Sequence, residues 1–291
     1  MIKSITVTNH LNESIELVLT RPDLSGFSVL SVEGLGPVVA TINTTELATG
    51  DGGVFNSAKL SQRNITMDLL FEDIYESVED IRLKSYKYFP VKKKITLLVE
   101  TDRRLASIEG YVESNEPTMF SSRCGCQISI ICPNPLFTDA KGRQVTSFSV
   151  LEPLFEFPFG ISSDGVEMGN LIKETVKIIP YDGDADAGMT IHITAVDTAS
   201  GIILDNLSTG GSMRINTIMS AGDEIVITTS KGKKSIIRIR NGIKTNILNL
   251  MSRNVEWFTL SKGDNIFKYS ANSGVNNIDV TIENDVLYSG V

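Results

Sequence analysis

The C-terminal part of this chain consists of short strand-like runs separated by glycine-containing turns. Between residues 254 and 291 the runs lie at residues 257–260, 265–269 and 277–282. Lys262-Gly263-Asp264 and Ser273-Gly274 supply the turns between them. Strands punctuated by such turns about every ten residues are typical of a β-sandwich. We therefore expect a sandwich here, and a sandwich without reactive groups is more often a structural or binding module than an enzyme.

The length of 291 residues suits two domains, each able to bury its own core. Pro133 and Pro135 interrupt the strand pattern, so we place the boundary there and expect domains at residues 1–134 and 135–291. The first reads as mostly β with one helix, and the second reads as β throughout. The expected fold class is mainly β.

One helix is expected at residues 74–89. Asp73 stands where an N-cap belongs, Glu76 follows as a capping-box partner, and Pro90 ends the helix. Helical spacing predicts one buried stripe, formed by Ile74, Val78, Ile81, Ser85 and Tyr88.

Residues 48–57 are rich in glycine and lie between strand-like runs. We interpret them as the mobile tip of a long hairpin. The cluster lacks the Lys-Ser/Thr pair of a phosphate-binding P-loop, so its glycines indicate a turn and not a nucleotide site.

The best candidate for a metal site is Asp182-Gly183-Asp184-Ala185-Asp186, whose alternating carboxylates resemble the start of a calcium loop. A calcium loop of the EF-hand type needs Gly at the sixth place and Glu at the twelfth, where this chain has Ala187 and Ile193. A solvated turn between strands is the favoured interpretation.

Three cysteines, Cys124, Cys126 and Cys132, have neither the number nor the spacing of a disulfide framework. A zinc site would need a further ligand, and His10 and His192 are the chain's histidines. We expect buried or half-buried thiols in a strand, and we expect no metal or cofactor.

No catalytic set is recognisable in the sequence. Nucleophile elbows of the G-x-S-x-G type are absent, and His192 falls on the polar face of an alternating strand. The single tryptophan, Trp257, could stack on a sugar, but a Trp beside Phe258 in a strand is more often part of a core. The chain is therefore expected not to be an enzyme.

The net charge of −8 is shared evenly by the two predicted domains. This acidity argues against nucleic-acid binding, although an acidic surface suits a passage through which DNA slides without sticking. No apolar run approaches the roughly 20 residues that span a bilayer. The N-terminus alternates like a strand and lacks the apolar region of a secretory signal, which indicates that the chain folds in the cytoplasm where it is made.

Several stretches in order resemble the distal tail protein family of long-tailed bacteriophages, also called the siphovirus-type tail component. They are YKYFP (86–90), ITLLV (95–99), TDRR (101–104), IEGYVE (108–113), EPTMF (116–120), QISIICPNPLF (127–137), FPFGI (157–161), GDN (263–265) and YSGV (288–291). The resemblance extends over nearly the whole chain.

This resemblance implies a tail-tube-like β-barrel or sandwich with one flanking helix, followed by a galectin-like β-sandwich. It implies a homo-hexameric hub ring in the virion, at the distal end of the tail. The ring would join the tail-tube protein to the tail-tip or baseplate hub protein, and DNA would pass through it without specific binding. The peripheral domain could carry a receptor-binding protein. Gly50, Gly52, Gly53 and Phe55 are then candidates for a subunit interface, because extended arms add strands to a partner's sheet edge.

Two other functions are compatible with the residues. One is a host-receptor or carbohydrate-binding module, with Trp257 exposed on a concave sheet. The other is a tail-associated cell-wall hydrolase, which needs a carboxylate pair or a metal site that the sequence does not display.

Overall fold

The computed structural model describes residues 1–47, 49–118, 120, 123–153, 169–253 and 255–291. The chain forms two compact units: unit 1 contains residues 1–142 and 287–291, and unit 2 contains residues 143–286. The predicted boundary at 134/135 falls just before β10 (Phe137–Asp139), which pairs with β8 (Leu105–Thr118) and with β23 (Leu287–Tyr288). These pairings keep both β10 and the C-terminal residues in unit 1.

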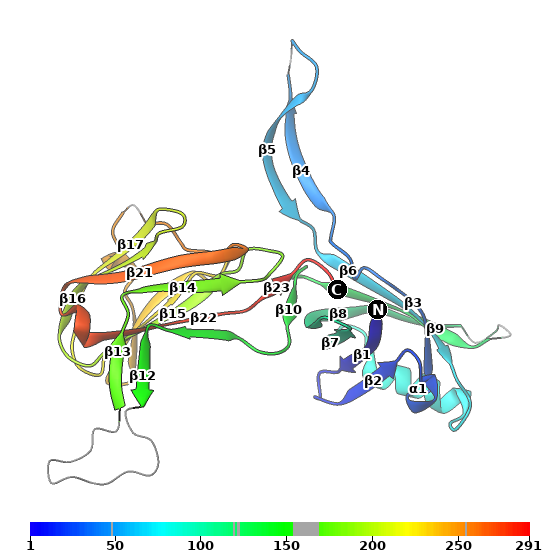
Figure 1. The fold of residues 1–291 in the computed structure, drawn as a ribbon. Helices are drawn as coiled ribbons and strands as arrows, with labels where there is room; N and C mark the ends of the chain where they lie inside the picture. The colour runs from blue at the N-terminus through cyan, green and yellow to red at the C-terminus, as the bar shows by residue number, and fades with distance from the viewer. Residues whose placement is uncertain (48, 119, 121–122, 154–168, 254) are drawn as a thin grey trace, which may run out of the picture. The chain divides into compact units, whose positions relative to one another are not determined.

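The main sheet of unit 1 has nine antiparallel strands. Seven follow the order β2-β1-β7-β8-β9-β6-β3, while β10 pairs with β8 and β23 pairs with β10 (Figure 1). The remaining strands are β1 (Ile2–Thr8), β2 (Ser14–Val18), β3 (Phe27–Glu33), β6 (Arg63–Phe71), β7 (Lys94–Thr101) and β9 (Gly125–Cys132). A 3-10 turn, η1 (Pro22–Leu24), connects β2 to β3. In the part of the chain that the structure describes, β2 and β3 form the two edges of this sheet.

Alternation along these strands builds the core of unit 1. Every second residue of β6 is buried, including Ile65, Met67 and Leu69, and β7 contributes Leu97 and Val99 in the same way. Burying one large apolar side chain contributes about 1.5–3 kcal/mol to the free energy of folding. This face of the sheet therefore contributes strongly to the stability of unit 1.

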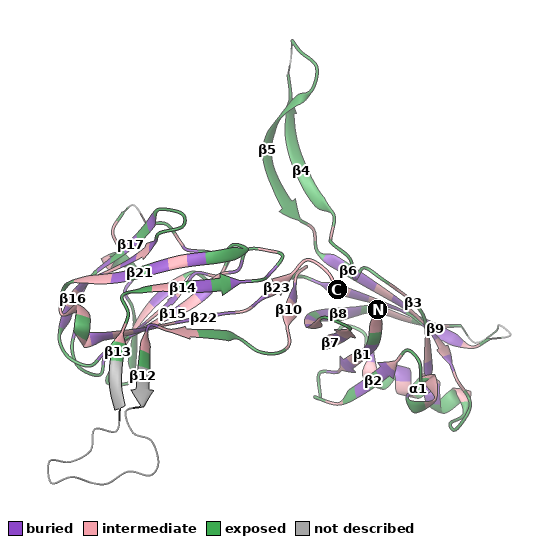
Figure 2. Ribbon diagram, viewed as in Figure 1, coloured by how far each residue is buried: buried purple, intermediate pink, exposed green. Residues whose placement is uncertain are grey.

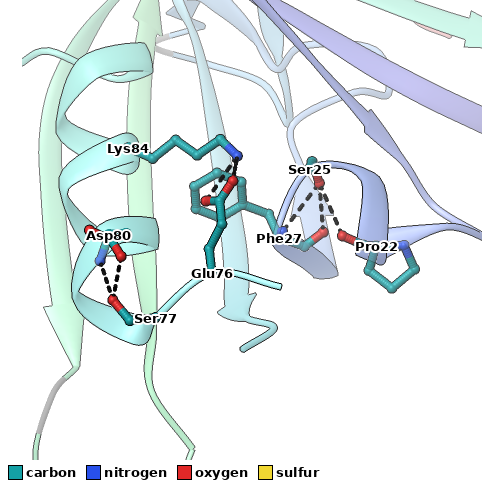
Figure 3. A network of polar contacts seen from close by, with 7 residues as sticks. All are labelled: Pro22, Ser25, Phe27, Glu76, Ser77, Asp80 and Lys84. Carbon is teal, nitrogen blue, oxygen red and sulfur yellow. Dashed lines mark hydrogen bonds and ion pairs between the residues drawn. The ribbon is translucent and has the colours of Figure 1, made fainter. Parts of the chain in front are cut away.

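Helix α1 (Val78–Tyr88) begins four residues later than the predicted start at residue 74. The N-cap is Ser77, whose hydroxyl accepts a hydrogen bond from the backbone N–H of Asp80 at 3.2 Å (Figure 3). The prediction of Asp73 as the N-cap was wrong, because Ser77 satisfies a backbone donor of the first turn. Glu76 instead binds the ammonium group of Lys84, with atoms 2.9 Å apart.

The buried stripe of α1 is confirmed for Ile81 and Ser85, whereas Ile74 lies outside the helix and is 57% exposed. A Cβ placed on Gly26 would come within 3.3 Å of the Ile81 side chain, so glycine at this turn allows the close approach of the helix. Asn115 of β8 donates to the carbonyl oxygen of Ser85 at 3.3 Å, which joins the helix to the sheet.

Unit 2 contains a six-stranded and a four-stranded antiparallel sheet. The larger has the order β11 (Gln144–Ser147), β22 (Ile278–Asn284), β15 (Met189–Ala195), β18 (Glu224–Thr228), β19 (Ser235–Arg240), β20 (Ile243–Asn246). The smaller has the order β14 (Val176–Tyr181), β21 (Gly263–Ser273), β16 (Ala199–Asn206), β17 (Gly211–Met219). A separate pair is formed by β12 (Ser149–Pro153) and β13 (Gly169–Lys173), and two 3-10 turns are η2 (Leu248–Leu250) and η3 (Val275–Asn277).

The core of unit 2 is formed by the inner faces of its two sheets. Burial alternates strictly along β17, and aromatic rings meet edge to face in the interior. The ring of Phe148 lies 5.4 Å from that of Tyr269, and the ring of Phe258 lies 5.6 Å from that of Phe267. Such pairs stabilise a core beyond the burial of their area.

The predicted strand at residues 257–260 is not formed, although Leu260 makes an isolated bridge to Ala187. Phe258 is buried, whereas Trp257 is half-buried with the ammonium group of Lys234 5.4 Å from its ring centroid. The interpretation of Trp257 as a core residue was therefore wrong: its neighbour occupies the interior.

The structure confirms the predicted fold class, which is mainly β with one helix in unit 1 and a sandwich in unit 2. No helix among the described residues is long and apolar enough to cross a membrane.

Replacing Asp223 with Asn is expected to destabilise unit 2 by about 2 kcal/mol. The Asp223 side chain is 3% exposed and accepts from Nε of Arg240 at 2.7 Å and from the backbone N–H of Ser220 at 2.8 Å. The hydrogen bond from Arg240 lowers the pKa of Asp223. A lowered pKa contributes stability that is lost as pH falls, so the difference between wild type and variant should shrink below about pH 4.

Urea unfolding followed by the fluorescence of Trp257, the chain's single tryptophan, measures this effect within unit 2. Asp182→Asn, which alters an exposed carboxylate of the same unit, is the matched control. Equal stability of wild type and Asp223→Asn at pH 7 would contradict the prediction.

Candidate functional site: the exposed arm

Strands β4 (Ala40–Glu46) and β5 (Gly53–Leu60) form a two-stranded antiparallel ribbon, which we call the arm. It lies in sequence between β3 and β6 and stands clear of the nine-stranded sheet (Figure 1). Every residue of both strands is exposed, as the uniform green of the arm in Figure 2 shows. A two-stranded ribbon is at best marginally stable in water, and this one buries neither of its faces against the rest of the chain.

One face of the arm is apolar. The register pairs Ala40 with Leu60 and Ile42 with Ala58, which places these four side chains on the same side. Ile42 is 62% exposed and Leu60 is 47% exposed. Large apolar side chains gathered on one exposed face are typical of a protein–protein contact.

A β-bulge adds Phe55 to this apolar face. Asn43 pairs with Ser57 and Thr44 pairs with Phe55, so Asn56 is the extra residue. Strict alternation would place Phe55 on the same side as Ser57. The inserted residue instead turns Phe55, which is 63% exposed, to the side of Ile42.

The opposite face of the arm is polar and linked by hydrogen bonds between its side chains. The amide nitrogen of Asn43 donates to the hydroxyl of Ser57 at 3.0 Å, and that of Asn56 donates to the hydroxyl of Thr45 at 2.6 Å. Val54 is the large apolar exception on this face. The arm is therefore two-sided, with side chains that suit a partner on one face and water on the other.

The four residues predicted for the interface all lie in the arm. Gly50 and Gly52 are in the turn, Gly53 begins β5, and Phe55 lies on the apolar face. Ala48, also part of the predicted tip, lies outside the described residues. Gly52 has a φ of +91°, which favours glycine, and its carbonyl accepts from the backbone N–H of Leu47.

The apolar partners of Phe55 in the arm were not predicted from the sequence. Ala40, Ile42, Ala58 and Leu60 are spaced two apart on their strands, and this spacing was the available signal. The bulge carried no such signal.

The arm is anchored at its base by Arg63, the first residue of β6, which is 1% exposed. Nη1 of Arg63 donates to the carbonyl oxygens of Gly34 and Gly36, the latter at 2.6 Å, just before the arm begins. Burial lowers the pKa of Arg63, because removal from water disfavours the charged guanidinium. The carbonyl groups compensate for that loss of hydration.

The other candidate sites do not assemble into chemical centres. Asp182, Asp184 and Asp186 are exposed, and the part of the chain that the structure describes holds no group of three side chains able to bind a metal. His192 lies on the outer face of its sheet as predicted, with Nδ1 2.9 Å from a carboxylate oxygen of Glu224.

The expectation of buried or half-buried thiols is confirmed. Cys126 and Cys132 are buried in β9, and Cys124 is half-buried just before it. Burial raises the pKa of Cys126 to about 12 and that of Cys132 to about 11. These two thiols stay protonated at neutral pH and are poor nucleophiles.

Part of the chain matches a protein family, and nearly the whole chain resembles a solved structure. Residues 182–284 match the family model described as the siphovirus-type tail component, C-terminal domain. The crystal structure of the SPP1 Dit protein, described as a paradigm of the hub adsorption apparatus of phages that infect Gram-positive bacteria, has a TM-score of 0.64 and 12% identity, covering 97% of this chain and 98% of that chain.

Two further structures are of the phage P2 baseplate in its activated conformation. The one with Ca has a TM-score of 0.45 and 12% identity, covering 97% of this chain and 98% of its own. The one with Sr has a TM-score of 0.42 and 13% identity, covering 96% and 97%. A search of curated proteins gives no match.

These findings define the class: the chain has the fold of SPP1 Dit, a phage protein described as a hub adsorption apparatus. More specifically, residues 182–284 match the C-terminal domain of the siphovirus-type tail component family. This confirms the resemblance drawn from the sequence, and the match is to structural proteins and not to an enzyme family. One stretch used for that resemblance, residues 157–161, lies outside the described residues.

Replacing Gly52 with Ala is expected to weaken the tip of the arm by about 1 kcal/mol, because alanine is strained at a positive φ. Gly50 has open space around its Cβ position and no positive φ, so Gly50→Ala is the matched control. Amide exchange at Thr45 and Val54, which pair near the tip, measures the difference. Equal exchange in the two variants would show that the turn does not depend on Gly52.

Proposed function

We propose that this protein is a structural hub of the phage tail tip, in which unit 1 of six copies closes into a ring through the arms. The ring joins the tail-tube protein to the tail-tip or baseplate hub protein. The observation that carries this proposal is the arm, whose apolar face is exposed to solvent in the single chain. The fold shared with a protein described as a hub adsorption apparatus supports the same role.

A ring explains why the arm has this form. A rotation that closes allows every copy to give an arm and to receive one, so that no arm is left without a partner. The arm presents strand edges as well as an apolar face, and β2 and β3 offer sheet edges to which a neighbour's strand could be added. Both kinds of contact favour a second copy of the chain as the partner of the arm.

The acidic balance of the chain supports a central passage for DNA. A net charge of −8 per copy would be multiplied in a closed ring, and like charges prevent DNA from adhering to the wall. We expect an electronegative channel, through which DNA passes without specific binding.

Unit 2 would serve as the peripheral domain, on which a receptor-binding protein could dock. Its sandwich carries a family match but no group of metal ligands among the described residues. Trp257 lies outside the strands and faces Lys234, which does not favour a sugar-stacking role.

Phe55→Ser is expected to weaken ring assembly at least about tenfold, because one buried aromatic contact is lost at each interface. Val54→Ser is the matched control: it alters the next residue of the same strand on the opposite face, with a similar exposed fraction. It should change assembly by less than about threefold. Mass photometry over a concentration series measures both.

Electron microscopy of the wild-type protein tests the ring itself, first alone and then with the tail-tube protein present. Rings with a central hole and the mass of six copies are the expected result. Monomers under both conditions would contradict the proposal, and so would rings that Phe55→Ser and Val54→Ser weaken equally.

A further inference from the structure

Arg63 contacts three separate segments of unit 1. Besides Gly34 and Gly36, it reaches Pro135 just before β10, whose carbonyl oxygen accepts from Nε at 2.8 Å. Its Nη2 donates at 2.7 Å to the carbonyl oxygen of Ser289, just after β23. The guanidinium also stacks on the ring of Phe137, 4.6 Å from its centroid. One side chain therefore contacts the base of the arm, strand β10 and the residue that follows β23.

The C-terminal residues 287–291, which we call the tail, also contact the base of the arm directly. The backbone N–H of Val291 donates to the carbonyl oxygen of Leu35 at 3.1 Å. A Cβ added to Gly290 would lie 2.9 Å from the same oxygen, so the two backbones are in close contact. Between Gly34 and Gly36, three successive carbonyl groups are thus used by Arg63 or by the tail.

A second arginine contacts the tail. Nη1 of Arg104 donates to the carbonyl oxygen of Gly290 at 2.9 Å, and its guanidinium lies 4.2 Å from the ring centroid of Tyr288. The Tyr288 hydroxyl is in turn 3.1 Å from a carboxylate oxygen of Asp139. Both of these Arg104 contacts go to the tail, whereas Arg63 joins the tail to the arm.

The chain leaves unit 1 after β10 and re-enters it at β23, so this pair is the connection to unit 2. We propose that Arg63 couples the arm to the tail, so that fixing the arm strengthens the docking of the two strands that lead to and from unit 2. Such coupling acts equally in both directions, and loosening the tail must also loosen the base of the arm. Its use during assembly rests on the proposed hub function, but the coupling is a property of the single chain.

Amide exchange of the full chain, measured by NMR at concentrations where it is monomeric, tests the coupling. The amide of Ser61, bonded to the carbonyl of Val39, reports on the base of the arm, and the amide of Val291 reports on the tail. Arg63→Lys has one nitrogen in place of three and cannot span the three segments. It should raise exchange at both amides by about tenfold or more.

Gly290→Ala perturbs the same contact from the tail and leaves Arg63 in place. We expect it to raise exchange at Ser61 as well as at Val291. Arg104→Gln also loosens the tail, so it should raise exchange at Val291 and, through the coupling, at Ser61. Arg21→Gln, which removes a guanidinium bonded to Asp23, is the control and should leave both amides within about twofold of wild type. Amides of the β1–β7 ladder serve as the reference for global opening.

Faster exchange at Val291 in Gly290→Ala with Ser61 unchanged would overturn the coupling, and this variant decides the question even if Arg63→Lys fails to fold. Faster exchange at Val291 in Arg104→Gln with Ser61 unchanged would also overturn it. A chain that shows the coupling but forms no ring would retain this inference and lose the proposed function, and rings formed by a chain without the coupling would do the reverse.

Discussion

When unit 1 folds, the guanidinium of Arg63 is buried, and hydrogen bonds to the protein must replace those that it made with water. Arg63 gives up water on burial, and backbone carbonyl groups from three segments take its place. Carbonyl dipoles can solvate a cation only if they are held around it, so the segments that carry them are held as well. The arm base, the residues before β10 and the tail are far apart in sequence. They meet at Arg63, because each supplies a carbonyl oxygen that accepts a hydrogen bond from its guanidinium.

The arm differs from the Arg63 site, because its apolar side chains remain exposed to water. Phe55 and Ile42 add little to the stability of the single chain while they remain solvated. Under the proposed hub function, the free energy of burying them would be available for association between copies. A rigidly anchored base and a solvated apolar ribbon therefore belong together, because an anchored arm loses less conformational entropy on binding.

Much of this architecture followed from the sequence. Alternation predicted the β class, helical spacing predicted Ile81 and Ser85 as buried, and the glycine cluster predicted the hairpin. The helix start was misplaced because Asp73 and Ser77 are both good N-caps, and only the packing of α1 against the sheet selects between them. The face of Phe55 could not be predicted, since a bulge reverses alternation without a mark in the sequence. Arg63 was unpredictable for another reason: its acceptors are backbone carbonyls, which every residue has.

The position of β23 at the far end of the chain has a consequence for biosynthesis. Unit 2 lies in sequence between β10 and β23, so the ribosome makes all of unit 2 before it makes the strand that completes unit 1. Domains generally fold as units during synthesis, N-terminal first. Unit 1 departs from that order, because Arg63 lacks the carbonyl of Ser289 until the tail has emerged. On a polysome, nascent copies would carry an arm whose base lacks this contact, and the hydrogen bond from Arg63 to Ser289 would form only once the tail has been synthesised.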